Sequence, residues 1–142
     1  YWFEDRRRTT LEPEEFPGLV PFERNLRRLV GEIREDGAIP VLMTQGTLYK
    51  PGYDHDERSV LWLYTHNGVG PDARWSLDTG RRGMELYNDV TRRVAAELGV
   101  RLIDLEPALP KDLSHFRDDC HYRAPGMEVI ARTVAEGLAP EL

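Results

Sequence analysis

The sequence has little cysteine, no long hydrophobic run and no concentration of positive charge. Cys120 is the single cysteine among 142 residues, which excludes an internal disulfide. No apolar stretch approaches the roughly 20 residues of a membrane-spanning helix, so we expect no transmembrane segment. The formal net charge is -6, and the only basic run lies at residues 6–8. We expect no nucleic-acid partner, because phosphate-backbone binding requires lysines and arginines clustered on one face.

Low-complexity tracts are absent as well, and the composition is that of a folded domain. Apolar residues make up 40% and charged residues 31% of the chain, proportions typical of globular proteins. The length suits one domain, which we expect to cover residues 1–142. The sequence opens at Tyr1 and not at a methionine, which fits either a removed signal peptide or a missing N-terminal piece.

Apolar residues at helical spacing predict three amphipathic helices, at residues 21–36, 78–98 and 125–138. Asp78 or Thr79 is the expected N-cap of the second helix, and a glycine follows each of the first two helices. The apolar positions are Phe22, Leu26, Leu29, Val30 and Ile33 in the first helix, Met84, Tyr87, Val90, Val94 and Leu98 in the second, and Met127, Ile130, Ala131, Val134 and Leu138 in the last.

Two short apolar runs, at residues 38–43 and 100–105, predict strands of a parallel sheet buried on both faces. Pro40 must then lie at the start of its strand or on an edge. Alternating helices and strands predict an α/β fold, a three-layer α/β/α sandwich with a parallel sheet. Two strands are fewer than the four to six or so of most sheets. Further strands must come from the middle of the chain or from a segment before Tyr1, and we favour the second.

Two stretches lack a clear period. Residues 1–20 are expected to be a loop with a short turn. Residues 46–82 are rich in glycine, proline and aromatic residues, and we expect a long loop insertion of the kind that often serves function. Within it, residues 60–64 fit a short strand or a helical turn equally well.

Asp118 and His121 form the most informative motif. They lie between a predicted buried strand and the last predicted helix, at the edge of the sheet where sites form in open α/β folds. An aspartate three residues before a histidine can reach the imidazole within one turn of a loop. Such a carboxylate fixes the tautomer of the ring and stabilises the imidazolium, while the other ring nitrogen takes a proton from a serine. By spacing alone, however, the pair is more often a surface or capping feature.

The context of this pair resembles the C-terminal signature of the SGNH (GDSL) hydrolases, in which Asp-x-x-His precedes a short spacer, a glycine and an amphipathic final helix. The resemblance implies a flavodoxin-like sandwich and ester hydrolysis through an acyl-serine. It also implies that Asp118 is the acid and His121 the base of a triad, with no metal and no organic cofactor. Further similarities lie at residues 25–26, 38–44, 87–88, 95–96, 99–100 and 103–105.

The motifs typical of the first half of that family are missing. None of Ser59, Ser76 and Ser114 has the family's Gly-Asp-Ser context, and the oxyanion glycine and Gly-x-Asn-Asp blocks are absent. Asn88 and Asp89 have the same residue types as the Asn-Asp of that block but do not correspond to it, because they fall inside a predicted helix, where we expect a polar face. The chain therefore resembles the C-terminal part of such a domain. We expect it to need the N-terminal part, and to be inactive and poorly soluble alone.

The substrate class is left broad: a small-molecule, carbohydrate or lipid ester. Trp62, Tyr64 and Trp75 are candidate substrate-binding residues, because ligand pockets are commonly aromatic. Packing of these rings against the body of the domain is an equally good interpretation.

Three alternatives stay open. The chain could be a non-catalytic interaction module or complementing fragment that binds through an open sheet edge. It could also be a metal-binding domain, although its spacing fits no zinc signature. Cys120 could be a nucleophile, although a neighbour of His121 in sequence is expected to point elsewhere. The residues of the metal alternative are the group at 54–57 and His115, Asp118, Asp119, Cys120 and His121.

Overall fold

A pair of parallel strands lies at the centre of the fold. The computed structural model describes residues 8–62 and 72–139. Strands β2 (Val41–Met43) and β4 (Arg101–Ile103) pair in parallel. Pro40 directly precedes β2, where its missing N–H removes no bond from the ladder. Both predicted strands are confirmed, with shorter bounds than expected. Met43 of β2 is 50% exposed, so the expected burial on both faces was wrong for this strand.

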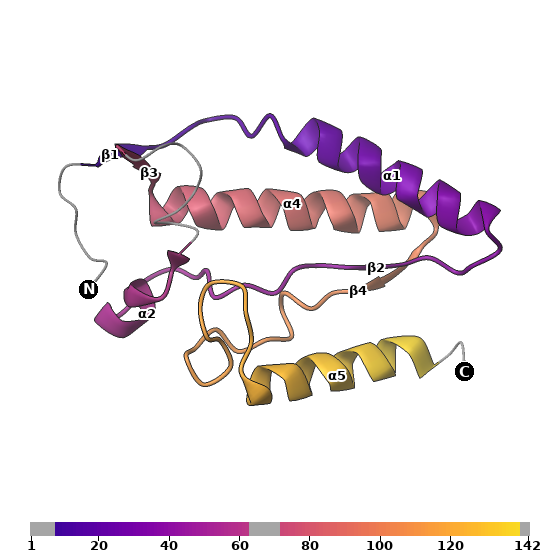
Figure 1. Ribbon diagram of the computed structural model, residues 1–142. Helices are drawn as coiled ribbons and strands as arrows, with labels where there is room; N and C mark the ends of the chain where they lie inside the picture. The colour runs from indigo at the N-terminus through magenta and orange to yellow at the C-terminus, as the bar shows by residue number, and fades with distance from the viewer. Residues whose placement is uncertain (1–7, 63–71, 140–142) are drawn as a thin grey trace.

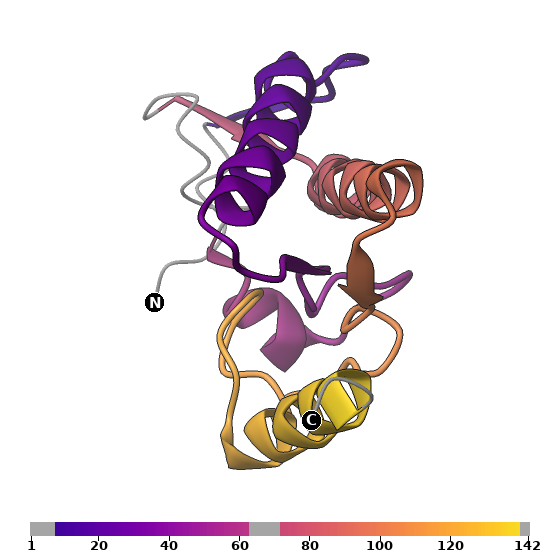
Figure 2. The same ribbon diagram turned by 90° about the vertical axis from the view of Figure 1, so that its right-hand side faces the viewer.

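Helices cover both faces of this strand pair (Figure 1). Helices α1 (Leu19–Glu35) and α4 (Leu77–Leu98) pack against each other on one face. Helix α5 (Ala124–Leu138) lies on the opposite face, against β4. The end-on view in Figure 2 separates the layers. The predicted α/β fold with parallel strands between helices is confirmed. Within the described residues, no helix is both long and apolar enough to cross a bilayer.

Helix α4 begins earlier than predicted. Its N-cap is Ser76, whose hydroxyl accepts a hydrogen bond from the Thr79 N–H at 3.1 Å. The prediction of Asp78 or Thr79 as the cap was wrong, because Leu77 already lies inside the helix. The C-terminal prediction was right: Gly99 has a φ of 58°, a left-handed conformation that costs glycine little.

Helix α5 presents the predicted face at three of its five apolar positions and departs from it at two. Ile130, Val134 and Leu138 are half-buried as expected, but Met127 is 52% exposed and Ala131 is also exposed. The reason is Gly126, since a Cβ there would lie 2.4 Å from the His115 carbonyl oxygen. This close approach turns Gly126 inward and therefore turns Met127 outward.

The two stretches expected to be loops contain short elements. Strand β1 (Thr9–Leu11) pairs in parallel with β3 (Ala73–Trp75) and forms a second small sheet. Helix α2 (His55–Ser59) follows a capping box closed by Asp54 and Glu57. Each element is three to five residues long, too short for a periodic pattern to reveal.

The buried apolar residues form two separate clusters. The scaffold core lies between the sheet and the helices α1 and α4, and consists of Val30, Leu42, Val90, Val94, Ala95 and Val100. The loop core lies under the segments that follow β2 and β4, and consists of Leu48, Tyr49, Leu61, Leu109 and Phe116.

Candidate active site

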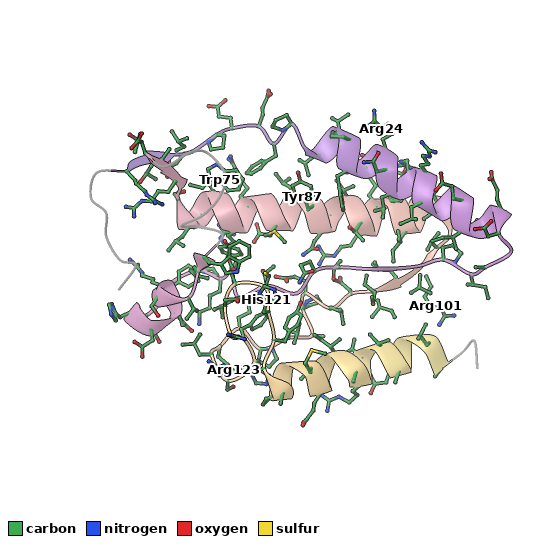
Figure 3. All side chains as sticks on the ribbon, viewed as in Figure 1. Arg24, Trp75, Tyr87, Arg101, His121 and Arg123 are labelled. Atoms are coloured by element: carbon green, nitrogen blue, oxygen red, sulfur yellow. The ribbon has the colours of Figure 1, made fainter. Side chains whose placement is uncertain are left out.

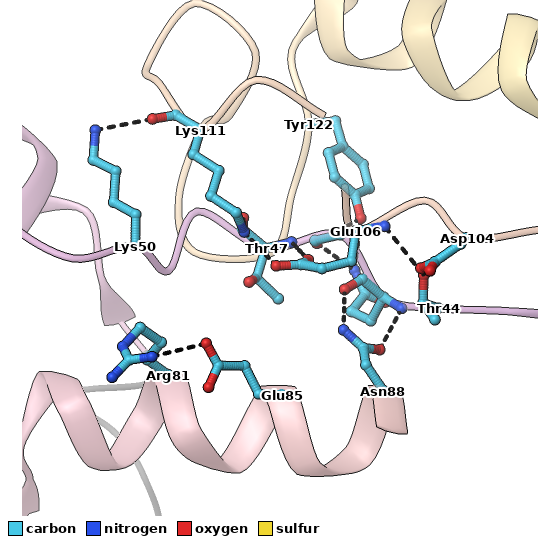
Figure 4. A network of polar contacts seen from close by, with 12 residues as sticks. Thr44, Thr47, Lys50, Arg81, Glu85, Asn88, Asp104, Glu106, Lys111 and Tyr122 are labelled. Carbon is cyan, nitrogen blue, oxygen red and sulfur yellow. Dashed lines mark hydrogen bonds and ion pairs between the residues drawn. The ribbon is translucent and has the colours of Figure 1, made fainter. Parts of the chain in front are cut away.

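The segments that follow β2 and β4 leave the same end of the sheet and are joined there by polar contacts (Figure 4). The Thr44 hydroxyl donates to Asp104 Oδ1 at 2.6 Å and accepts from the Glu106 N–H at 3.1 Å. The Thr47 N–H donates to Glu106 Oε2 at 2.8 Å. These bonds hold the two segments in register beyond the last paired residues of the strands.

Two lysines extend this network toward the loop core. Lys111 Nζ donates to the Thr47 carbonyl at 2.8 Å and pairs with the Glu106 carboxylate. Lys50 Nζ donates to the Lys111 carbonyl at 2.9 Å and pairs with the largely buried Glu57 carboxylate. Glu57 and Asp54 also close the capping box of α2, and neither belongs to a group of three metal-ligating side chains among the described residues.

Asn88 joins helix α4 to the start of this region. Its Oδ1 accepts from the Gln45 N–H at 2.8 Å, and its Nδ2 donates to the Gln45 carbonyl at 2.9 Å. The side chain is buried, so the prediction of a polar, solvent-facing position was wrong for Asn88 and right for the exposed Asp89. A buried side-chain amide can satisfy both backbone groups of a residue in an irregular segment.

Residues 116–122 form a tight turn that presents Asp118 and His121. Phe116 and Tyr122 form an antiparallel bridge, and the Arg117 N–H donates to the His121 carbonyl at 2.8 Å. Phe116 is buried in the loop core, with the Tyr122 ring 5.2 Å away. The Tyr122 hydroxyl in turn donates to the Gly46 carbonyl at 2.8 Å, which fixes the turn to the segment after β2.

The carboxylate of Asp118 and the imidazole of His121 are in hydrogen-bond contact. His121 Nδ1 lies 2.9 Å from Asp118 Oδ2 and 3.0 Å from Oδ1. The backbone N–H groups of Cys120 and His121 also donate to Oδ1, at 3.0 and 2.8 Å. Burial acts to raise the pKa of Asp118, but these hydrogen bonds outweigh it and the pKa is lowered. Asp118 is therefore ionised at neutral pH, as the orienting group of a base must be.

His121 lies among the loops between α4 and α5 in the view of Figure 3. Its side chain is 64% exposed, and the described residues offer Nε2 no hydrogen-bond partner. Trp62 lies stacked with the imidazole, with ring centroids 6.4 Å apart and an interplanar angle of 21°. Trp62 thus lies beside the predicted base, although their separation in sequence gives no signal of it. Its role in substrate binding stays a prediction.

Of the two residues between Asp118 and His121, Asp119 points into the loop core, whereas the Cys120 thiol lies beside the His121 ring, with Sγ 3.7 Å from Nδ1. The expectation that Cys120 points elsewhere was therefore wrong. Asp119 is buried, accepts a hydrogen bond from the Tyr49 hydroxyl at 3.3 Å, and its carbonyl accepts from the Leu48 N–H at 3.0 Å. Burial, together with the negative charges of Asp119 and Asp118, raises the pKa of the Cys120 thiol to about 11. A thiol that stays protonated at neutral pH is a poor nucleophile, which argues against the nucleophile interpretation of Cys120.

A second serine, histidine and aspartate lie together nearby, and the sequence analysis did not single them out. Ser114 Oγ lies 2.9 Å and Asp112 Oδ1 2.8 Å from His115 Nδ1. Both contacts use the same ring nitrogen, so His115 cannot take a proton from the serine with one nitrogen while the carboxylate holds the other. The hydrogen bonds from Ser114 and His115 hold the pKa of Asp112 well below its usual range. The arrangement is a locally bonded turn.

Trp75 is the other described candidate for substrate binding, and its role stays a prediction. It lines a cavity of about 710 Å³ between residues 11–18 and helix α4, together with Tyr49 and Tyr87. Neither Asp118 nor His121 lines this cavity. Tyr64 lies outside the described residues. The structure therefore brings Trp62 to His121 but separates Trp75 from it.

Comparison with known proteins yields a fold and no family. No family model and no curated protein matches the sequence. LAE5, an alpha/beta hydrolase enzyme from the metagenome of Lake Arreo, Spain, is similar over 85% of this chain, with a TM-score of 0.59 and 20% identity. Axe2, an acetylxylan esterase from Geobacillus stearothermophilus, is similar over 84% of this chain, with a TM-score of 0.58 and 21% identity, and a catalytic mutant of Axe2 gives 0.59. The chain spans about half the length of these structures, 47% of each.

Proposed function

We propose that this chain is part of a serine-type ester hydrolase of the SGNH (GDSL) type and supplies the acid and base of its catalytic triad. The observation that carries the proposal is the Asp118 carboxylate on His121 Nδ1, at 2.9 Å, with Nε2 turned to solvent. The fold shared with part of an alpha/beta hydrolase and of an acetylxylan esterase supports it.

In the proposed reaction, His121 Nε2 removes the proton of a serine hydroxyl as the serine attacks the ester carbonyl. It then returns that proton to the leaving alkoxide. Asp118 holds the proton of Nδ1 and stabilises the positive charge that develops on the ring. No metal or organic cofactor takes part in these steps.

The nucleophile is proposed to come from another segment, because the three serines of this chain are engaged elsewhere. Ser76 caps α4, Ser59 Oγ donates to the Asp56 carbonyl at 2.6 Å, and Ser114 is bonded within its turn. The outer edge of β2 supports this view, since β2 pairs only with β4 among the described residues. Ile39 and Met43 beside that edge are 70% and 50% exposed, as expected where further strands of the same domain pack.

The experiment is ester hydrolysis by two polypeptides, the 142-residue chain and a version extended upstream to include a Gly-Asp-Ser segment. With p-nitrophenyl acetate we expect no turnover by the chain and turnover by the extended protein. His121→Ala and Asp118→Asn should each lower kcat of the extended protein by about 10³- to 10⁴-fold. Acetylated carbohydrate is the natural ester to test next, because Axe2 is an acetylxylan esterase.

His115→Ala is the matched control, because His115 resembles His121 in having an aspartate on Nδ1 but lies outside the proposed site. It should leave kcat within about twofold. Hydrolysis by the chain alone that disappears in His121→Ala would contradict the predicted inactivity. If the extended protein and its His121→Ala variant had the same kcat, the proposed function would be overturned.

A further inference from the structure

Asp118, Cys120 and His121 bring three different metal-ligating atoms together. A carboxylate oxygen, the Cys120 sulfur and an imidazole nitrogen lie within 4.8 Å of one another. In the part of the chain that the structure describes, this is the one group of three or more such residues at that spacing. His115 and Asp119, considered as ligands from the sequence, do not belong to it.

One of the separations already fits a tetrahedral metal site. Zinc bonds of about 2.3 Å to sulfur and about 2.0 Å to nitrogen place those two ligand atoms about 3.5 Å apart at the tetrahedral angle. Cys120 Sγ and His121 Nδ1 are 3.7 Å apart. The nitrogen and the carboxylate oxygen, now 2.9 Å apart across a hydrogen bond, would have to separate to about 3.4 Å.

The carboxylate is held in place for this role. Its Oδ1 accepts two backbone N–H groups and lies 3.0 Å from His121 Nδ1, whereas Oδ2 contacts only that ring nitrogen, at 2.9 Å, among the contacts of the described residues. Oδ2 can therefore exchange its contact with the proton on His121 Nδ1 for a bond to a metal ion. The two backbone hydrogen bonds that fix Asp118 through Oδ1 are kept. The ring of His121 is exposed enough to move by the few tenths of an ångström required.

We propose that Asp118 Oδ2, Cys120 Sγ and His121 Nδ1 form a site for a thiophilic divalent cation, Zn²⁺ in the first place. On binding, the Cys120 thiol loses its proton to solvent, the single proton of the neutral His121 ring moves from Nδ1 to Nε2, and water fills the fourth position of the ion. A site with sulfur and nitrogen ligands selects Zn²⁺ or Co²⁺ over Mg²⁺ and Ca²⁺, which prefer oxygen ligands alone.

The consequence for activity rests on the proposed function. An ion on Nδ1 would break the hydrogen bond between Asp118 and His121, so the base would lose its orientation and its source of charge stabilisation. Zn²⁺ would then inhibit the hydrolase, and the Cys120 thiol, 3.7 Å from His121 Nδ1, would be one of the groups that bind the ion.

The test uses the 142-residue chain, purified without a histidine tag, kept reduced and freed of metal. Titration with Co²⁺ should produce the ultraviolet charge-transfer band of a Co²⁺–thiolate bond and saturate at one ion per chain. Zn²⁺ should then abolish the band by displacement. Cys120→Ala should remove the band, and Asp118→Asn and His121→Gln should each weaken binding at least about tenfold.

His55→Ala is the matched control, because His55 also lies among acidic residues but outside the cluster. It should leave the band and the affinity unchanged. Circular dichroism of each variant establishes that the fold is kept. A titration of the folded chain without a thiolate band, or a band that survives in Cys120→Ala, overturns the site. Neither result depends on ester hydrolysis, so failure here is distinct from failure of the proposed function.

Discussion

The two cores of this protein are built on different principles. The six buried residues of the scaffold core are all aliphatic and come from regular helices and strands or their ends. The loop core contains the rings of Tyr49 and Phe116, comes from irregular segments, and lies beside buried polar groups such as Glu57 and Asp119. Regular elements satisfy their own backbone groups, so apolar area alone can hold them together. Irregular segments need side chains for that purpose, which explains the density of polar contacts around the loop core.

The largest expected effect on the free energy of unfolding comes from truncating a buried side chain in each core in turn. Phe116→Ala should lower the free energy of unfolding by about 3–5 kcal/mol, because a buried ring is lost and a cavity remains. Val94→Ala removes less volume from the scaffold core and should cost about 2 kcal/mol. Urea denaturation measures both changes.

Hydrogen exchange on the same two variants distinguishes the cores further. We expect Phe116→Ala to lose protection at residues 112–123 while α4 stays protected. Val94→Ala should instead lower protection throughout. Equal loss of protection at both places in Phe116→Ala would mean that the two clusters unfold as one unit.

The second effect on stability concerns the contact between helix α4 and the segment after β2, where Asn88 binds the backbone of Gln45. Asn88→Ala removes the partners of the part-buried N–H and carbonyl of Gln45 and should cost about 1–3 kcal/mol. Asp89→Ala is the neighbouring control, and removal of its exposed ion pair with Arg92 should cost less than about 1 kcal/mol. A similar cost for the two variants would show that the Asn88 bonds matter little.

The smallest expected effect is the change in stability at acidic pH that comes from Asp118. The pKa of Asp118 is lower in the folded protein than its ordinary value of 3.8, so the ionised carboxylate stabilises the fold above that pH. This contribution should disappear as the pH falls from 3.8 through the lower, folded pKa. The stability difference between the natural chain and Asp118→Asn should therefore shrink toward strongly acidic pH. A difference that stays constant across that range would contradict the lowered pKa.

The sequence predicted best where signals are local or periodic. Gly99 marked the end of α4, and the apolar runs marked both central strands. The contact between Asp118 and His121 was expected because three residues of one turn suffice to form it. The sequence did not predict contacts between distant segments: β1 with β3, Asn88 with Gln45, or Trp62 with His121. Such contacts depend on how the chain crosses itself, and no pattern along one segment records them.

The glycine at position 126 has a consequence for how motion at the turn could be observed. The Cα of Gly126 packs directly against the His115 carbonyl, so the start of α5 is in contact with the residue that leads into the turn carrying Asp118 and His121. The next residue, Met127, points to solvent. A spectroscopic label at position 127 would therefore report displacement of the turn from outside, without touching the pair whose movement it measures.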